Sequence, residues 1–341
     1  MSGALRIHRA GPGLTLQDGG RPGYLALGLS RGGAADPLAL AEGAALLGQD
    51  AGLAAIEMAG MGGEFEATAP LRIALTGAPM VATLDGTRLA WNASHSLQPG
   101  QRLGIGAARE GIYGYLHVGG GFEAEERLGA RSAHLAAGIG APLDAGESLT
   151  TGKDTGTATG LCLPQEARFS GGTLRIVASV HTGRFPESLR ARFEDTVFQR
   201  DPRSNRMAAR LASEGEGFGI DIGRAILSEA IVPGDIQITG DGTPFVLMAE
   251  CQTTGGYPRI GTVLPCDLPR VAQAGPGARL AFRFVTLEEA VAAETRAAEA
   301  RATLGRRVEP LIRDPASIPD LLSYQLVSGV TAGRELEPEG G

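Results

Sequence analysis

The chain has 341 residues, of which 43% are hydrophobic and 20% are charged, a composition that excludes disorder of the whole chain. The formal charge of -7 argues against a nucleic-acid backbone as the main partner. No apolar run approaches the roughly 18 residues that a membrane span needs. Three cysteines do not make a disulfide framework, and the N-terminus shows no secretory signal, so we expect a cytoplasmic protein.

The glycine content predicts many short strands joined by tight turns. The 52 glycines follow no collagen-like period, so they are available for turns. Strand-like runs bounded by Gly or Pro recur at 71–75, 113–118, 174–180, 245–249 and 279–285. Such strands are typical of barrels or sandwiches rather than of a doubly wound sheet. We therefore predict a mainly β protein with a few short helices.

The clearest early helix is predicted to begin after Asp36. An Asp side chain accepts hydrogen bonds from the free N–H groups of a first helical turn, and Pro37 lacks only a donor that would be unpaired there. Gly48 is a typical stop signal. A second, short helix is expected at about 186–194.

A third helix is predicted near the C-terminus. Thr286 and Glu289 have the spacing of a capping box, and the segment that follows is rich in Ala, Glu and Arg to about Leu304. The rest is expected to be a partly disordered tail, above all after residue 331. The apolar run 321–327 could dock on the body or on a partner.

The chain is predicted to consist of two halves and a tail. Residues 150–160 are almost all Thr, Gly and Asp, which indicates a surface loop between an N-terminal half, 1–160, and a C-terminal half, 161–285. The helix and tail occupy 286–341. A short echo between 17–24 and 252–259 is consistent with two related halves.

Several common chemistries lack their motifs. Gly152-Lys153 lacks the rest of a Walker A loop, and Lys153 is the only lysine in the chain. No Gly-x-Gly-x-x-Gly opens a helix after a strand, and the histidines and cysteines are scattered without metal-binding spacing. We therefore expect no metal site and no nucleotide site within this chain.

The segment 28–32 reads Gly-Leu-Ser-Arg-Gly, which matches the Gly-x-Ser-x-Gly pattern of a nucleophile elbow. Such an elbow joins a strand to a helix by a sharp turn, whereas three residues intervene here before the cap at Asp36. In a chain this rich in glycine the pattern arises easily by chance. The residues alone favour that interpretation over a catalytic Ser30.

The first candidate site is a glycine-rich turn with polar neighbours. Its side chains are Gln17, Asp18, Arg21, Tyr24, Arg31 and Asp36. Glycines let backbone N–H groups approach a ligand, and a guanidinium fork holds a carboxylate or phosphate better than an ammonium group does. The alternative is a hairpin with solvent-facing arginines and a plain helix cap.

Two further candidates lie in the second half. One is Gln252, Thr253, Thr254, Gly255, Gly256 and Tyr257, which directly follows an apolar strand. Polar groups at the end of a buried strand commonly form a site, although Thr hydroxyls also stabilise ordinary turns. The other is Ser204, Asn205 and Arg206, where Asn and Arg could hold an amide or a carboxylate. An Arg-rich solvated surface is the alternative there.

Taken together, these segments resemble the allophanate hydrolase subunit 2 family. The resemblance covers roughly 4–286 and rests on several motifs in order: 16–24, 30–36, Thr76-Gly77-Ala78, Gly129-Ala130-Arg131-Ser132, 204–207 and 252–258. It adds Arg131 and Ser132 to the candidate binding residues. Glu250 and Cys251 depart from the family pattern, which usually has an Asp and often a basic residue at these positions.

The resemblance implies a fold of two cyclophilin-like β-barrel halves and a role as one component of a larger assembly. It implies an ATP-dependent 5-oxoprolinase-type complex that opens 5-oxo-L-proline, a lactam, to L-glutamate. The implied partners are a subunit 1 (B-type) homologue and a lactam-utilisation (A-type) protein, with ATP bound on a partner or at an interface. All candidate residues are assigned to substrate binding; no catalytic residue is identified.

Two other functions stay open. The same module occurs as the carboxyltransferase component of biotin-dependent urea or amide carboxylases, in which case biotin would be the cofactor. Some relatives are non-enzymatic regulators that bind a kinase-inhibitor-like subunit 1 homologue. Co-purification with a biotinylated protein would support the carboxyltransferase function. Tight binding of subunit 1 without turnover would support the regulatory function.

Overall fold

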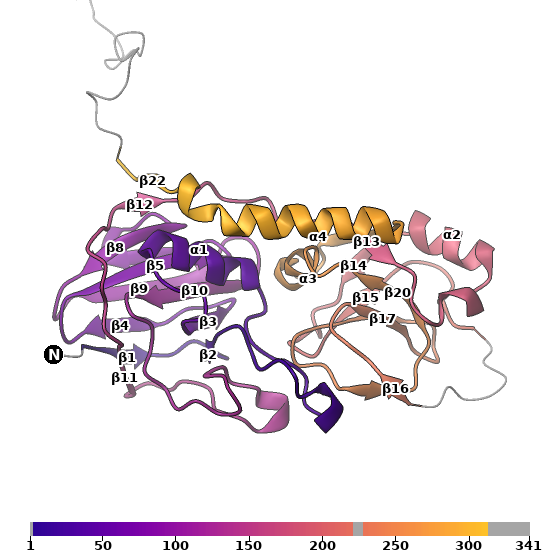
Figure 1. Cartoon of the computed structure of the whole chain (residues 1–341), viewed down its shortest axis with the longest axis horizontal. Helices are drawn as coiled ribbons and strands as arrows, with labels where there is room; N and C mark the ends of the chain where they lie inside the picture. Colours follow the sequence, from indigo (N-terminus) through magenta and orange to yellow (C-terminus); the bar gives the residue numbers. More distant parts are fainter. Residues whose placement is uncertain (1–2, 221–227, 313–341) are drawn as a thin grey trace, which may run out of the picture.

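The computed structural model describes residues 3–220 and 228–312. Figure 1 shows two β-rich halves side by side, with helix α4 (Leu287–Ala302) along the upper side. The mainly β class predicted from the sequence is confirmed. The predictions for 321–327 and for the tail after 331 lie outside the described residues.

In the N-terminal half, the described residues form two sheets that share one core. The first sheet runs in the order β11 (Ser148–Thr150), β1 (Ala4–Arg9), β4 (Glu64–Ala67), β9 (Arg102–Ala108), β6 (Met80–Leu84) and β7 (Thr87–Arg88). The second runs β2 (Thr15–Gln17), β3 (Ala55–Ala59), β10 (Tyr113–Val118), β5 (Leu71–Gly77), β8 (Ala93–Leu97), β12 (Leu161–Cys162) and β22 (Glu309–Pro310). This half is thus two packed sheets, whereas the second half is the closed barrel.

The shared core follows from alternation along the strands. On β1, Leu5 and Ile7 are buried between exposed Arg6 and His8, as expected for a strand with one face against a core. β10 is buried along its whole length, because the second sheet is covered on its other face by helix α1 (Pro37–Leu47). Two-sided burial explains why every residue of this strand is buried, His117 included.

The C-terminal half is a closed barrel. Its strands run β13 (Gly171–Val177), β20 (Arg259–Val263), β17 (Asp235–Ile238), β18 (Pro244–Leu247), β15 (Ala208–Ala212), β14 (Phe198–Arg200) and β21 (Arg279–Phe284). β13 and β21 pair in parallel, and the other pairs are antiparallel. A small separate ribbon joins β16 (Glu229–Ala230) to β19 (Thr254–Gly255).

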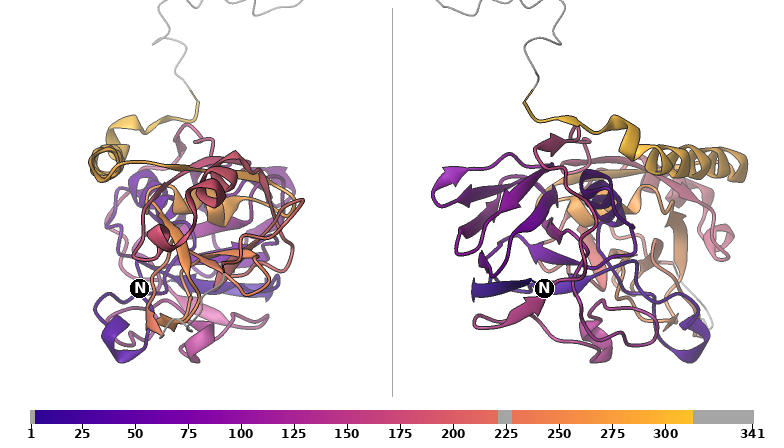
Figure 2. Two further views of the ribbon diagram at one scale, coloured as in Figure 1. Left: turned by 90° about the vertical axis from the view of Figure 1, so that its right-hand side faces the viewer. Right: turned by 60° about the vertical axis from the view of Figure 1, so that its left-hand side comes forward.

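Helices close and brace the barrel. α2 (Glu187–Asp195) buries Phe193 among Phe198, Phe218 and Phe282, with ring centroids 4.9–5.2 Å apart. α3 (Leu268–Gln273) packs against β13 at the boundary with the N-terminal half. α4 lies on the outer surface, as the end-on view in Figure 2 shows. None of the described helices is long and apolar enough to pass through a bilayer.

The predicted helix signals correspond to observed caps. Asp36 accepts hydrogen bonds from Leu38 N and Ala39 N, and Gly48 ends α1 with φ 61°. Thr286 and Glu289 form the reciprocal capping box of α4. The sequence did not indicate α3, nor the short 3-10 turns η1 (Leu25–Leu27), η2 (Leu135–Ala137), η3 (Thr182–Arg184) and η4 (Leu304–Arg307).

The two halves are joined by a common core and by one buried amide. Apolar residues of both halves belong to a single cluster that includes Tyr115 of β10 and Phe282 of β21. Gln273 of α3 is fully buried; its Oε1 accepts from Ile112 N and Tyr113 N, and its Nε2 donates to Tyr113 O. β12 lies just after the predicted boundary at residue 160 yet pairs with β8. The domain boundaries themselves stay a prediction.

Candidate functional site

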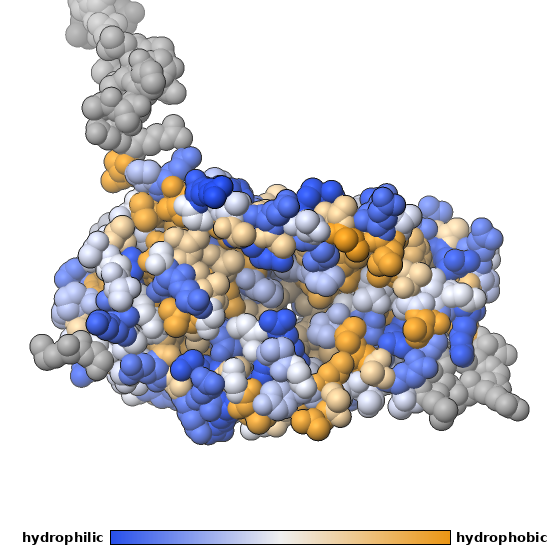
Figure 3. Space-filling view, in the orientation of Figure 1, coloured by the Kyte–Doolittle hydropathy of each residue, from blue (hydrophilic) through white to orange (hydrophobic). Residues whose placement is uncertain are grey.

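Loops from the two halves meet around a cavity of about 490 Å³. The N-terminal half contributes 28–30, His134 and 136–137, and the barrel contributes Met207 and 250–254. Next to the lining residues in the chain, Gly32 N donates to Ala249 O at 3.1 Å, which ties the two halves together directly. The loops lie on the lower side of the molecule in Figure 1, where the indigo turn η1 projects between the halves. Figure 3 shows polar and apolar side chains interspersed over this side.

Arg206 is a clamp between the two halves, beside this cavity. Its Nε donates to Glu250 Oε1 at 2.6 Å, its Nη2 donates to Gly33 O at 2.5 Å, and its Nη1 donates to Glu57 Oε1. Both carboxylates are almost fully buried. With its three nitrogens occupied, the guanidinium holds the halves together and keeps two buried charges neutralised.

Behind the clamp, a chain of buried hydrogen bonds leads to the start of α1. Glu57 Oε2 accepts from the hydroxyl of Tyr115 at 2.6 Å, and that hydroxyl accepts from Asp36 N at 2.8 Å. Burial, reinforced by the neighbouring Glu57 charge, raises the pKa of Tyr115 well above its ordinary value. The phenol therefore stays protonated and fixes the position of Glu57.

Asp36 joins this network from its other side. Its Oδ2 accepts from Arg168 Nε at 2.7 Å and from Gln273 Nε2 at 2.8 Å, while Oδ1 caps α1. Arg168 also donates to both oxygens of Glu42, whose pKa burial raises. Asp36 is fully buried. Its carboxylate therefore organises the boundary between the halves, and it does not line the cavity.

The glycine-rich turn 17–24 packs behind the cavity wall. Asp18 accepts from Gly20 N and from Arg131 N, and it is buried. Arg21 is also buried and donates through Nη2 to Ser132 O at 2.5 Å. The Gln17 side chain donates to Thr15 Oγ1 and to Ala133 O. These groups connect the turn to 130–134.

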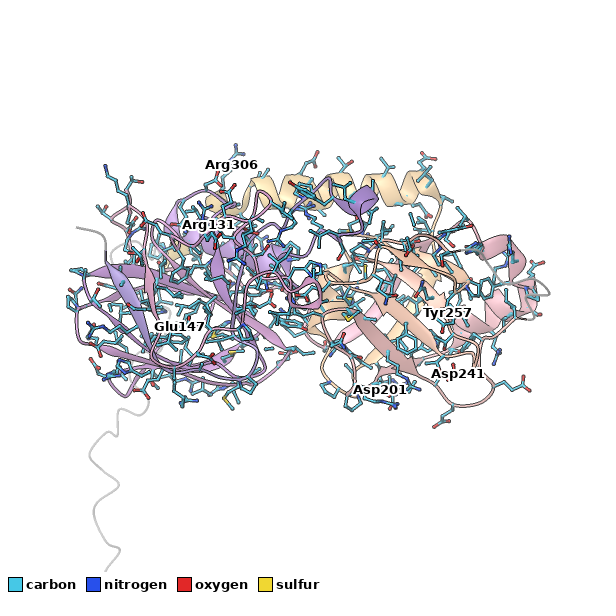
Figure 4. All side chains as sticks on the ribbon, turned by 90° about the horizontal axis from the view of Figure 1, so that it is seen from below. Arg131, Glu147, Asp201, Asp241, Tyr257 and Arg306 are labelled. Carbon is cyan, nitrogen blue, oxygen red and sulfur yellow. The ribbon has the colours of Figure 1, made fainter. Side chains whose placement is uncertain are left out.

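Other predicted residues lie nearer the surface. Arg31 is exposed and donates to Gly19 O at 2.8 Å, and Tyr24 is half-buried. Arg131 and Ser132 line a separate cavity of about 220 Å³ in the N-terminal half. Figure 4 shows Arg131 over that half, well away from Tyr257 over the barrel.

The third candidate segment mainly builds a turn. Ser204 Oγ donates to Asp201 O and accepts from Arg210 N, and Asn205 Oδ1 accepts from Met207 N and Ala208 N. These are local side-chain to backbone bonds of the kind that fix loops. They place Met207 in the cavity wall.

The segment 252–257 is the one that faces the cavity most directly. Gln252, Thr253 and Thr254 line it, and within the described part of the chain the amide of Gln252 and the hydroxyl of Thr254 have no hydrogen-bonding partner. Gly255 lies in β19 and Gly256 follows it, exposed. Tyr257, half exposed, lines an adjoining, more apolar cavity of about 280 Å³. Polar donors thus stand next to an apolar recess.

Two residues that the sequence did not assign to binding stand in the cavity wall together. Ser30 Oγ lies 2.8 Å from His134 Nε2, and both side chains are buried. The Gly-x-Ser-x-Gly pattern marked Ser30, but nothing in the sequence connects it to a histidine 104 residues away. Glu57 was also missed; an acid inside an apolar strand was its available signal.

The described residues contain no cluster of three or more His, Cys, Asp or Glu side chains that could hold a metal ion. What the cavity offers instead is a hydroxyl, an imidazole, a primary amide and threonine hydroxyls near a clamped pair of carboxylates. Such groups bind and polarise a small amide, carboxylate or carbonyl compound.

Comparisons with known proteins point to one family. The model of the carboxyltransferase domain, subdomain A and B, matches residues 27–284. The chain is 34% identical over 298 residues to the C subunit of 5-oxoprolinase from Escherichia coli, covering 85% of this chain and 94% of that protein. It is 25% identical over 305 residues to urea amidolyase of Saccharomyces cerevisiae, covering 82% of this chain but only 16% of that protein.

Solved structures agree on the fold. A crystal structure of TTHA0988 superimposes with a TM-score of 0.76 at 30% identity; the match covers 83% of this chain, which spans 56% of that one. The urea amidolyase of K. lactis gives a TM-score of 0.79 at 20% identity, covering 92% of this chain and 21% of that one. This second likeness shows a shared fold.

Proposed function

Because this chain belongs to the carboxyltransferase domain family of subdomain A and B type, we propose that it is a subunit of an ATP-dependent 5-oxoprolinase-type complex. The observation that carries the proposal is the match to the C subunit of E. coli 5-oxoprolinase, which spans 94% of that protein. In this proposal, the complex opens 5-oxo-L-proline to L-glutamate, and partner subunits supply the ATP chemistry.

The reaction has a clear physical requirement. A five-membered lactam is stabilised by amide resonance, and its nitrogen is a poor leaving group. Phosphorylation of the carbonyl oxygen by ATP weakens that resonance, after which water attacks readily. The protein must orient the ring and bind the charge that develops on the oxygen, which hydrogen-bond donors in a desolvated cavity do well.

The cavity between the halves has suitable groups for such a ligand. In our proposal, Gln252 and Thr254 donate to the substrate carboxylate or carbonyl, because they face the cavity without partners of their own among the described residues. Thr253 lines the same wall. Arg206 contributes indirectly, since it holds Glu250 and Gly33 and thereby positions both sides of the cavity.

The proposal is tested by co-expressing the chain with the neighbouring reading frames and measuring 5-oxoproline-dependent ATP hydrolysis. Gln252→Ala and Thr254→Ala should each lower kcat/KM about tenfold or more, the effect of losing a hydrogen bond to a charged ligand. Gln199→Ala and Thr173→Ala, at exposed barrel positions, are the matched controls and should leave the rate unchanged. Full activity in the two cavity variants would overturn the assignment.

A second candidate is the carboxyltransferase component of a biotin-dependent urea or amide carboxylase. The description of the matching family model and the relation to urea amidolyase favour it. It predicts that a biotin carboxylase and a biotinylated protein co-purify with the chain, and that avidin blocks turnover. The 5-oxoprolinase-type complex requires neither, so one pull-down separates the two candidates.

A further inference from the structure

The cavity wall holds a serine and a histidine in the arrangement of a nucleophile and its base. Ser30 Oγ and His134 Nε2 are 2.8 Å apart, and the side chains are about 2% and 3% exposed. Both line the cavity, Ser30 from the loop before α1 and His134 from the start of η2. This spacing lies within the reach required for proton transfer between them.

The glycine pattern around Ser30 makes this contact possible. Gly32 adopts φ 63°, and a Cβ on it would stand 2.9 Å from Cδ2 of the His134 ring. Any larger residue at 32 would crowd the imidazole and force a shift of it or of its neighbours. The second glycine of the Gly-x-Ser-x-Gly segment therefore has a specific structural role beside the histidine.

A carboxylate stands on the far side of the imidazole. Glu250 Oε2 lies 4.0 Å from His134 Nδ1 and accepts from Ala136 N at 3.1 Å. Arg206 Nε holds the other oxygen of Glu250 at 2.6 Å. A hydroxyl, an imidazole and a carboxylate follow one another in this order in the triad of a serine hydrolase. The distance between His134 Nδ1 and Glu250 Oε2 is about one ångström longer than a hydrogen bond, as is common in sites without a ligand.

The imidazole can act as a base toward Ser30 in one of its two neutral tautomers. In the arrangement shown, Nδ1 of His134 accepts from Ala137 N at 3.2 Å, which places the ring proton of the neutral imidazole on Nε2, toward Ser30. Ala137 N also donates to the carbonyl oxygen of His134 at 3.0 Å. This N–H therefore keeps a partner in the other tautomer, in which Nδ1 carries the proton and Nε2 accepts from Ser30. Burial is the main cause that lowers the pKa of His134. The negative charge of Glu250 opposes this by raising the pKa, while Arg21 and Arg206 lower it by smaller amounts. The ring is thus neutral near pH 7, and the tautomer protonated at Nδ1 has the Nε2 lone pair that Ser30 needs.

We propose that Ser30 is a nucleophile, with His134 as its base, and that the chain alone transfers small acyl groups from esters or amides to water. Ser30 Oγ bonds to the acyl carbon while its proton moves to His134 Nε2. The bond from that carbon to the leaving oxygen or nitrogen then breaks, and the leaving group takes the proton. Water attacks the resulting ester by the same proton path and releases Ser30. No ATP or partner is needed, so this activity stands apart from the proposed function.

The test uses the purified full chain without partners. Incubation with a fluorophosphonate is followed by intact-mass and peptide mass spectrometry, and hydrolysis of p-nitrophenyl acetate is followed by absorbance. We expect one adduct per chain, on Ser30, and a fall in esterase rate of about 100-fold or more in Ser30→Ala. An adduct elsewhere, no adduct, or an unchanged rate in that variant would overturn the proposal.

Matched variants separate the base from a structural role. His134→Gln should slow labelling of Ser30 at least about tenfold. His8→Gln is the control, because His8 contacts Glu66 at 2.9 Å on the surface without a serine, and Ser96→Ala is the control for serine. In Ser30→Cys, alkylation of the thiol by iodoacetamide should also slow when His134→Gln is added. Equal rates with and without His134 would refute its role.

Glu250 acts through His134 and is therefore a positioning residue. In Glu250→Gln, the negative charge that raises the pKa of His134 is lost. The acid limb of the labelling-rate profile should then move to lower pH, an effect that a purely structural role would not produce. An unshifted limb would remove Glu250 from the mechanism.

Discussion

At the scale of single residues, the neutralisation of buried charges decides which substitutions the boundary between the halves tolerates. Arg206 bridges Glu57 and Glu250, and both carboxylates are about 1–3% exposed. Removing one partner of a buried ion pair leaves a charge without compensation, which costs more than the intact pair contributes. The clamp is therefore sensitive to truncation even though it lies beside a cavity.

Arg206→Ala should lower the free energy of unfolding by about 3–5 kcal/mol, measured by urea denaturation. Arg203→Ala is the matched control, because Arg203 pairs with Asp201 while its side chain is 72% exposed. Screened pairs of this kind contribute little, and no measurable change is expected there. Similar stabilities for the two variants would contradict the buried-clamp interpretation.

A second residue-scale prediction concerns acid. Complete burial lowers the pKa of His117 from 6.5 to about 3. Below pH 6.5, His117 therefore binds a proton in the unfolded chain but not in the folded chain. The free energy of unfolding should fall as the pH is lowered from 6.5 to about 3. Below about pH 3, this group should cause no further loss. His117→Gln removes the titration, and its unfolding free energy should depend less on pH in that window. Parallel curves would refute the assignment.

At the scale of elements, local signals and tertiary pairing contribute differently. Caps, turns and alternation are encoded within a few residues, and α1 therefore begins after Asp36 as predicted, while β10 spans the predicted 113–118. α3 was not predicted because its six residues, with Pro269 near the start, are too few to show a periodic pattern.

The capping box of α4 offers an element-scale test. Thr286→Ala removes the acceptor for Glu289 N and should lower the unfolding free energy by about 1 kcal/mol. Thr295→Ala, an exposed mid-helix position of the same helix, should be neutral or slightly stabilising because Ala favours helix. Thermal unfolding of the two variants gives the comparison, and a larger loss at 295 would contradict it.

What the sequence could not supply is the pairing of distant segments. β1 pairs with β11 from the far end of the N-terminal half, and local patterns do not indicate which strands join which of the two sheets. The same limit applies to the candidate site. Residues 252–254 were indicated by a polar loop after an apolar strand, and they do line the cavity. The contact between Ser30 and His134 could not be predicted, because only the folded chain brings these distant residues together. The binding roles of the predicted residues stay predictions.

At the scale of the whole molecule, Gln273 couples the halves through four hydrogen bonds, to Ile112 N, Tyr113 N, Tyr113 O and Asp36 Oδ2. Replacing its amide by a hydrocarbon of similar size would leave buried backbone groups without partners. Each such group costs about 1–3 kcal/mol, and all of the cost falls at the boundary.

Gln273→Leu should therefore separate the unfolding of the two halves. Trp91, the single tryptophan, lies in the N-terminal half, so its fluorescence reports on that half while far-UV circular dichroism reports on both. In the unmodified chain the two urea transitions should coincide, and in the variant they should diverge. Coincident, merely shifted transitions would show that the apolar core alone couples the halves.

The last described strand has a consequence for biosynthesis. β22 pairs with β12 at the edge of the second N-terminal sheet. The two strands are neighbours in this sheet, but the whole barrel and α4 separate them along the chain. A ribosome must therefore release about 310 residues before this sheet receives its final strand. Until then the nascent protein presents a bare β12 edge, where a chaperone or a second nascent chain could bind first.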